Sequence, residues 1–180
     1  MSRVALNYKD YAALPDDGRR YQILDGELYV TPAPSRQHQK VSGNFFAALH
    51  AYVRRRRLGE VYAAPTDVIL EDTTIVQPDI LFIANDRLGV RSARGIDGAP
   101  TLVVEILSPS TAETDRERKL QLYARFGIPW YWIVDPDTRT VEVYRLEGMR
   151  YALASRHAGS DAIAAEPFAG LTLTPDALWD

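Results

Sequence analysis

The sequence predicts an α/β or α+β fold in which a mixed central β-sheet carries helices on its faces. Three observations support this prediction. Near-continuous apolar runs, such as residues 101–107, indicate strands that are covered on both faces. Segments with apolar side chains every three or four positions indicate amphipathic helices between the strands. The dipeptide Asp25-Gly26, flanked by apolar residues, indicates an N-terminal β-hairpin.

The N-terminal part of the chain predicts a short lead-in followed by this hairpin. Residues 8–14 form a short helical or irregular segment that ends at the turn cluster of residues 15–18. The two predicted strands, residues 21–24 and 27–30, flank Asp25-Gly26, which supplies the positive φ of a two-residue turn.

One amphipathic helix and three strands come next. Residues 32–35 interrupt the second strand of the hairpin, and the helix that follows ends near Gly59. Residues 60–70, 73–84 and 101–107 are rich in apolar and β-branched side chains, and each predicts a strand. The apolar positions of the helix recur at intervals of three and four: Val41, Phe45, Leu49, Tyr52 and Val53.

The second half of the chain predicts another helix and further strands. Residues 110–113 match a capping box that opens a helix running to Phe126, where Gly127 ends it. Residues 130–134 and 140–144 predict two strands. We expect one domain, made of a lead-in (1–19), a core (20–146) and a tail of short C-terminal strands (147–180).

Composition excludes several classes of protein. The chain has 180 residues and no cysteine, which excludes disulfides, zinc thiolate sites and cysteine nucleophiles and fits a cytoplasmic protein. The N-terminus lacks an apolar signal core, and no run approaches the roughly 18 apolar residues that cross a bilayer, so we expect no membrane partner. The formal net charge of -3 means that any contact with nucleic acid must be local.

Two acidic residues interrupt apolar strands. Asp79 follows Pro78 at the start of one strand and Glu105 lies inside the next, with 25 residues (80–104) between them. A buried carboxylate must be paired, protonated, hydrogen-bonded or bound to a metal, because burying it alone costs several kcal/mol. Two such acids favour a magnesium or manganese site. The alternatives are a core acid paired with an arginine for Glu105 and a strand-start turn for Asp79.

Pro78-Asp79 followed by Glu105-Ile106-Leu107 resembles the PD-(D/E)xK phosphodiesterase motif of restriction endonuclease-like folds. Leu107 occupies the position at which the motif has lysine. The departure leaves open a second interpretation, in which the chain is a non-catalytic nucleic-acid-binding or assembly module that retains the nuclease fold.

Longer segments resemble the Uma-type restriction endonuclease family of that superfamily. The resemblance implies a restriction endonuclease-like fold and a metal-dependent phosphodiester hydrolase, most simply a Mg²⁺- or Mn²⁺-dependent DNA endonuclease. It spans about residues 10–175 and is carried mainly by residues 21–27, 105–111 and 131–136.

The same resemblance implies that a lysine of the following helix replaces the one missing at Leu107, and this chain offers Lys119. Glu105 lies about 10 Å down its strand and Lys119 about 12 Å along the returning helix, so their side chains reach similar depth. The alternative is an exposed salt bridge between Lys119 and Asp115, four residues earlier.

Other candidates for the site are weaker. Such folds often present a further acid to the metal, for which we consider Glu27, although it also suits an exposed strand position. His38 begins a helix and would contact phosphate or orient water, the alternative being a surface or capping group. A turn explains Asp135, which we do not place in the site.

A local contact with nucleic acid would come from the densest basic run of the chain: Arg54, Arg55, Arg56 and Arg57. These arginines would bind the DNA backbone. The alternative is the solvated last turn of a helix, where cations interact favourably with the helix dipole. A homodimer would match the two-fold symmetry of duplex DNA.

Overall fold

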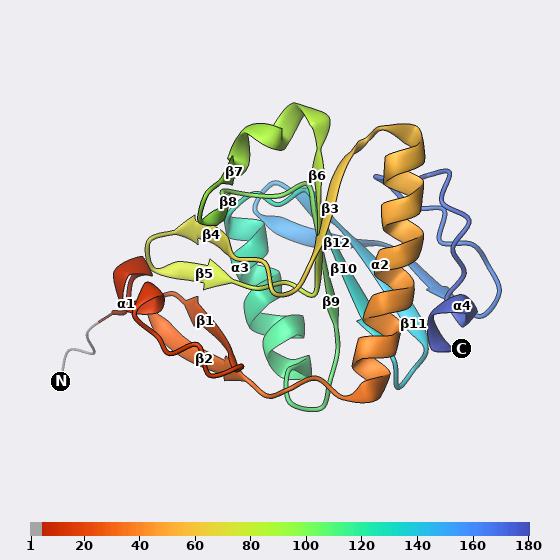
Figure 1. Ribbon diagram of the computed structural model, residues 1–180. Coiled ribbons are helices and arrows are strands. Elements are labelled where there is room, and N and C mark those ends of the chain that lie inside the picture. The colour runs from red at the N-terminus through yellow and green to blue at the C-terminus, as the bar shows by residue number, and fades with distance from the viewer. Residues whose placement is uncertain (1–4) are drawn as a thin grey trace.

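The computed structural model describes residues 5–180 and contains two six-stranded sheets (Figure 1). The strands of the first, the outer sheet, are β1 (Arg20–Leu24), β2 (Glu27–Thr31), β4 (Val68–Glu71), β5 (Thr74–Val76), β7 (Arg91–Ser92) and β8 (Gly95–Asp97). Those of the second, the central sheet, are β3 (Gly59–Ala63), β6 (Ile80–Ala84), β9 (Leu102–Ile106), β10 (Trp130–Asp135), β11 (Thr140–Glu147) and β12 (Arg150–Ala158). Their orders are β2-β1-β5-β4-β8-β7 and β12-β11-β10-β9-β6-β3.

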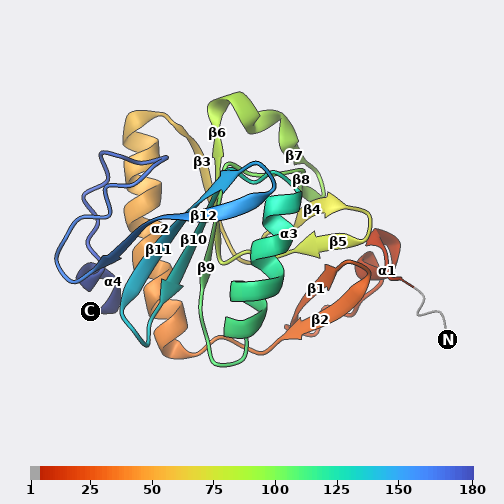
Figure 2. The ribbon, with the colours of Figure 1, turned by 180° about the vertical axis from the view of Figure 1, so that it is seen from behind.

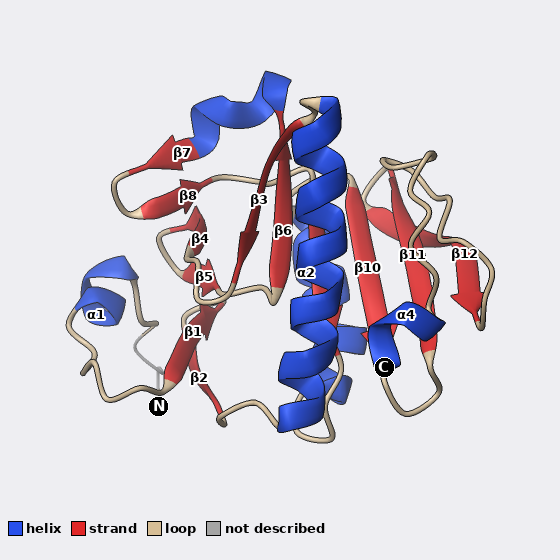
Figure 3. Ribbon diagram, turned by 45° about the vertical axis from the view of Figure 1, so that its right-hand side comes forward, coloured by secondary structure: helices blue, strands red, loops and turns tan. Residues whose placement is uncertain are grey.

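The helices are α1 (Tyr8–Ala12), α2 (Arg36–Arg56), the 3₁₀-helix η1 (Asn85–Val90), the π-helix η2 (Thr114–Lys119), α3 (Leu120–Arg125) and α4 (Asp176–Trp179). Helix α2 runs along one face of the central sheet (Figure 3). Helix α3 lies on the opposite face, toward the outer sheet (Figure 2). Within residues 5–180, no helix is both long and apolar enough to cross a membrane.

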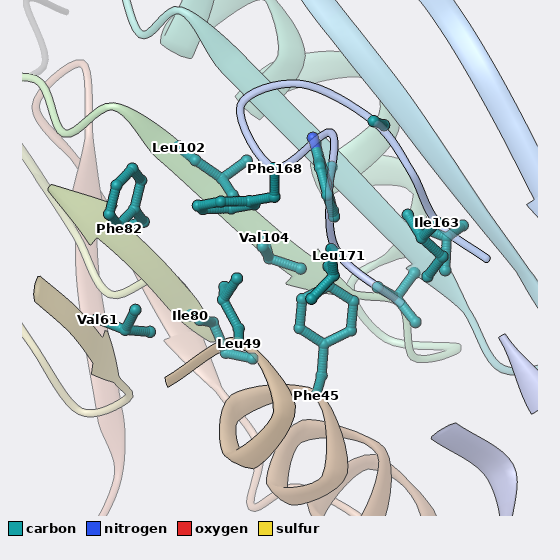
Figure 4. Close-up of a cluster of buried hydrophobic side chains, with 14 of the residues drawn as sticks. Phe45, Leu49, Val61, Ile80, Phe82, Leu102, Val104, Ile163, Phe168 and Leu171 are labelled. Carbon is teal, nitrogen blue, oxygen red and sulfur yellow. The ribbon is translucent and has the colours of Figure 1, made fainter. Parts of the chain in front are cut away.

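The face of the central sheet that carries α2 is apolar. Phe45 and Leu49 of α2 pack against strand residues such as Val104, and the C-terminal segment adds Phe168 and Leu171 (Figure 4). Fully burying such side chains stabilises the fold by roughly 1.5–3 kcal/mol each. This face supplies packing and fixes the position of α2 against β9.

The opposite face also has an apolar cluster, but a charged residue lies within it. Val103 and Leu107 pack with Leu122 and Tyr123 of α3. Since side chains alternate along a strand, Glu105 points to this same face. Strand β9 pairs parallel with β10 and antiparallel with β6, so Glu105 lies in the middle of a mixed sheet.

The predicted fold class is confirmed, and so is the N-terminal hairpin. Strands β1 and β2 pair antiparallel, with Leu24 opposite Glu27. Asp25 and Gly26 between them have φ values of 52° and 78°, the positive values that a tight two-residue turn requires. Residues 1–4, the start of the predicted lead-in, lie outside the described residues.

Two of the predicted strands are wrong in extent. Residues 60–70 form β3 and β4, and residues 73–84 form β5 and β6, and in each pair the two strands belong to different sheets. Pro65 and Pro78 interrupt the runs, because proline has no N–H to continue a ladder. An apolar run looks the same whether the chain stays in one sheet or crosses to another.

The second predicted helix is confirmed, but its start is different. Its first regular turns are the π-helix η2, and no side chain of the predicted capping box at residues 110–113 caps it. Ser108 and Thr111 instead join their hydroxyls across the preceding loop, 3.0 Å apart. The tail, residues 147–180, forms one long strand, β12, and the short helix α4 rather than two short strands.

Candidate functional site

A cavity of about 230 Å³ lies where several segments meet at one end of the central sheet. It is lined by residues of β1, the β2–α2 linker and the start of α2, the residue before β6, the end of β9, and η2 with the loop that leads into it. Figure 1 shows the linker and this loop side by side. The cavity contains four of the residues proposed from the sequence: Asp79, Glu105, Lys119 and His38.

Asp79 is held by three donors. Its Oδ1 accepts a hydrogen bond from Arg20 Nη1 at 3.1 Å, and its Oδ2 lies 3.1 Å from His38 Nε2. The backbone N–H of Ile106 donates to Oδ2 at 2.9 Å. Burial alone would raise the pKa of Asp79, but His38, Arg20 and this amide outweigh it and lower the pKa. A strand-start turn is therefore not the role of Asp79.

His38 is partly buried and faces this carboxylate. Burial lowers the pKa of His38, but the hydrogen bond to Asp79 and the negative charge of Asp79 outweigh it, so the pKa is raised. The backbone N–H of His38 is capped by Ser35 Oγ at 3.1 Å. The side chain of His38 is thus neither a helix cap nor a free surface group.

Glu105 is only 2 % exposed. Lys119 Nζ donates to its Oε1 at 2.9 Å, and the Tyr123 hydroxyl donates to the same oxygen at 2.7 Å. Burial raises the pKa of Glu105 to about 7, with Lys119 opposing the rise and the charges of Asp115 and Asp79 adding to it. Glu105 thus lies among like charges that a bound cation would neutralise.

Lys119 is also enclosed, at 5 % exposure, and contacts a second acid. Its Nζ lies 3.0 Å from Oδ1 of Asp115, which is 2 % exposed. The contact is an ion pair without hydrogen-bond geometry, so this buried Asp115 oxygen has no hydrogen-bond partner. The predicted pair with Asp115 therefore exists, but it is buried and shared with Glu105, and the exposed alternative is wrong.

The charge of Lys119 is fixed by this environment. Burial would lower the pKa of Lys119, but the charges of Asp115 and Glu105 outweigh it, and the pKa is raised. The ammonium group therefore stays protonated. Leu107, at the motif's usual lysine position, packs in the apolar cluster instead.

The structure does not bring Glu27 into the cavity. Glu27 lies on β2, where Arg118 Nη1 donates to its Oε2 at 2.8 Å, and it is not among the lining residues. The turn of the hairpin directs it toward η2 rather than toward Asp79. Asp135 accepts two backbone N–H groups in its own turn, as expected.

The four arginines of the basic run also lie outside the cavity, and all of them are exposed: Arg54, Arg55, Arg56 and Arg57. The first three form the last turn of α2, and Arg57 is its C-cap with a positive φ of 55°. They lie at the far end of α2 from His38, about 24 Å away at the usual helical rise. The solvated last turn is therefore their observed position, and a contact with DNA would be remote from the carboxylates.

The side chains present suit a hard divalent cation. Asp79 and Glu105 offer carboxylate oxygens to one cavity, and both donors to Glu105 use Oε1 rather than Oε2. In the described part of the chain, no three His, Asp or Glu side chains group closely enough to enclose a metal alone. Mg²⁺ characteristically binds one or two carboxylates together with water and substrate phosphate, so a two-acid site fits it.

Three residues that contact the site were not proposed for it from the sequence: Arg20, Tyr123, and Asp115, which was expected only in an exposed pair with Lys119. Asp115, Lys119 and Tyr123 are spaced four residues apart, so a search for ionisable side chains on the face of Lys119 would have found two of them. Arg20 gives no such signal, because its contact with Asp79 depends on how the two sheets meet.

Comparisons with known proteins agree with this fold. The family Uma2, described as "Putative restriction endonuclease", matches residues 8–176. An uncharacterized protein from Synechocystis sp. is 24 % identical over 143 residues, which cover 78 % of this chain and 80 % of that protein. A crystal structure of "a putative nuclease belonging to DUF820" from Anabaena variabilis shares the fold at a TM-score of 0.80, with 22 % identity and 97 % of each chain covered. The chain belongs to the Uma2 family of restriction endonuclease-like proteins.

Proposed function

We propose that this protein is a metal-dependent phosphodiesterase that cuts DNA, with Asp79 and Glu105 holding one or two Mg²⁺ or Mn²⁺ ions. One observation carries the proposal: Asp79, Glu105 and Lys119 come from three separate elements and line the same cavity. Two carboxylates and a lysine are what the PD-(D/E)xK motif brings together. Here the lysine comes from η2 instead of β9.

We assign a separate role in phosphodiester hydrolysis to each side chain of the site. Lys119, which stays protonated, donates hydrogen bonds and positive charge to the phosphate as negative charge develops on it. Arg20 and His38 keep Asp79 ionised and oriented toward the cavity. A divalent ion, when bound, polarises the phosphate and lowers the pKa of water. Positioning and charge neutralisation are the main requirements of phosphoryl chemistry.

Contact with DNA beyond the cavity is proposed for the exposed run Arg54–Arg57. Since these residues lie about 24 Å along α2 from His38, they would bind phosphates distant from the scissile one. Each such contact releases counterions, so binding would weaken steeply with salt. A homodimer and a cytoplasmic location remain predictions.

A second candidate function rests on the same network. Each buried carboxylate already has protein partners, Arg20 and His38 for Asp79, and Lys119 and Tyr123 for Glu105. Such a network, in which Asp79 and Glu105 are both paired, would also suit a binding or assembly module that no longer cuts. The effect of metal on the unfolding temperature distinguishes the two functions. Only a metal-binding nuclease site gains thermal stability from millimolar Mg²⁺ or Mn²⁺.

The test is cleavage of plasmid, linear and single-stranded DNA with Mg²⁺ or Mn²⁺ by the native protein and by Asp79→Asn, Glu105→Gln and Lys119→Met. We expect each variant to lose at least about a hundredfold in rate. Glu142→Gln, which removes another buried acid of the same sheet outside the cavity, is the control and should keep its rate. A native protein that cuts none of these substrates, or variants that cut equally well, would overturn the proposal.

A further inference from the structure

We infer that the substrate of this site is single-stranded or locally unpaired nucleic acid rather than an intact duplex, an inference that rests on the proposed function. The first observation is how deeply the proposed catalytic side chains are buried. Asp79, Glu105 and Lys119 lie almost wholly beneath the protein surface. A scissile phosphate must therefore enter the cavity to meet them, whereas a rigid rod lying on the surface cannot bring it there.

The second observation is size. The cavity holds about 230 Å³, the volume of roughly eight water molecules at about 30 Å³ each. This space accommodates a hydrated metal ion and one phosphodiester group. It is smaller than the usual range of about 300–1,000 Å³ for pockets that hold drug-sized ligands, so it cannot take up a base pair.

The third observation is the wall of the cavity. One side is the β2–α2 linker with Pro32 and Pro34, and the other is the loop with Pro109 between Ser108 and Ser110. Proline fixes φ, so these walls are stiffer than ordinary loops. A duplex is stiff as well, and one of the two partners would have to deform. A single strand bends freely and avoids this cost.

The fourth observation is charge. The cavity is lined by three carboxylates, and its cationic side chains, Arg20, His38 and Lys119, are all engaged with them. The walls contribute neutral hydroxyls and prolines. A duplex carries one negative charge per about 1.7 Å of its axis, twice the density of one strand, whereas the cationic side chains that line this cavity are already paired with its carboxylates.

The test compares one labelled oligonucleotide in three forms: alone, in a blunt duplex, and in a duplex with an unpaired central bubble. With Mn²⁺, we expect kcat/KM for the single strand and the bubble to exceed that for the duplex by at least about tenfold. Equal or faster cleavage of the duplex would overturn the inference and leave the proposed phosphodiesterase activity intact.

Cleavage of none of the three forms would instead overturn the proposed function. Fluorescence anisotropy of the same labelled forms then decides the inference, which requires tighter binding of the single strand than of the duplex and fails if the two bind equally. Ser110→Trp, which fills the cavity entrance from an exposed position, should lower single-strand cleavage or binding at least about tenfold. Glu113→Trp, an exposed neighbour outside the lining, is the matched control and should leave both unchanged.

Discussion

Two buried glutamates of the central sheet have similar neighbours but different chemistry. Ile133 of β10 pairs with Glu105 on one side and with Glu142 of β11 on the other, so the three residues form one row. Each glutamate meets a cation from η2, Lys119 for Glu105 and Arg116 for Glu142. A buried acid paired with a cation is therefore not in itself a sign of function.

The difference lies in the surroundings. Glu142 Oε2 accepts from Arg116 at 2.7 Å and from the Tyr144 hydroxyl at 3.0 Å, outside the cavity. Arg116 also binds Asp135, and its planar guanidinium suits such a structural role. Glu105 instead shares one lysine with Asp115 and faces a cavity. Excess negative charge beside an open space is what a metal site needs.

The largest expected difference between the Glu105 and Glu142 pairs is in how much each contributes to the free energy of unfolding. Lys119→Met leaves two buried acids without their cation and should cost about 3–5 kcal/mol of unfolding free energy in urea denaturation. Arg116→Met should cost only about 1 kcal/mol, because Arg116 is 35 % exposed and Glu142 keeps Tyr144. Adding Glu105→Gln to Lys119→Met should recover part of the loss. Equal losses in the two single variants would contradict the comparison.

The second difference is in pH dependence without metal. The pKa of Glu105 is raised by burial from 4.5 to about 7, so its contribution to stability is fully present below about pH 4.5 and is lost as pH rises through about 7. Relative to Glu105→Gln, the native protein should lose about 2 kcal/mol between pH 5 and pH 7. Asp79, whose pKa is lowered, stays ionised at both pH values in both proteins, and His38, whose pKa is raised, titrates in both, so the comparison removes their effects to first order. Urea denaturation at the two pH values measures the difference, and a constant difference would refute the assignment.

A smaller effect, on the rate of cleavage, is expected from replacing His38 than from replacing the residues above. His38→Gln loosens Asp79 and should lower kcat about tenfold with little change in KM. His157→Gln is the control, since His157 lies on β12 and contacts Ser155. Steady-state cleavage kinetics measure both. Unchanged kcat for His38→Gln would remove His38 from the site.

The smallest effect is expected in the salt dependence of binding. Replacing Arg54–Arg57 by alanine should reduce the slope of log K against log salt by about 0.7 for each lost phosphate contact with single-stranded DNA. Arg145→Ala with Arg150→Ala removes exposed charges from β11 and β12 and should leave the slope unchanged. Anisotropy titrations at several salt concentrations measure the slopes. An unaltered slope for the first variant would exclude the basic run from the interface.

The parts of this site that could be predicted from the sequence are those that depend on residues close together in the chain. Asp79 and Glu105 stand out because each interrupts an apolar run, and Asp25-Gly26 specifies its own turn. Lys119 followed from the resemblance and from the matching depth of strand and helix. These inferences need only the geometry of single elements.

The parts that could not be predicted depend on how elements meet. Arg20 reaches Asp79 across 59 positions of sequence, and its contact exists only because β1 lies beside the start of β6. The pattern of apolar residues also does not reveal that the chain crosses from one sheet to the other at Pro65 and Pro78, because the strands of both sheets are apolar. The Lys119–Asp115 pair likewise shares a small pocket with Leu24 and Tyr29 of the outer sheet, which the sequence did not separate from the central one.

Calorimetric titration of the metal-free protein with Mn²⁺ shows whether Asp79 and Glu105 hold a metal ion. We predict saturable binding by the native protein and by Glu142→Gln, and loss of that binding in Glu105→Gln. Native protein that binds no Mn²⁺, or Glu105→Gln that binds it as tightly as Glu142→Gln does, would contradict a metal site at Asp79 and Glu105.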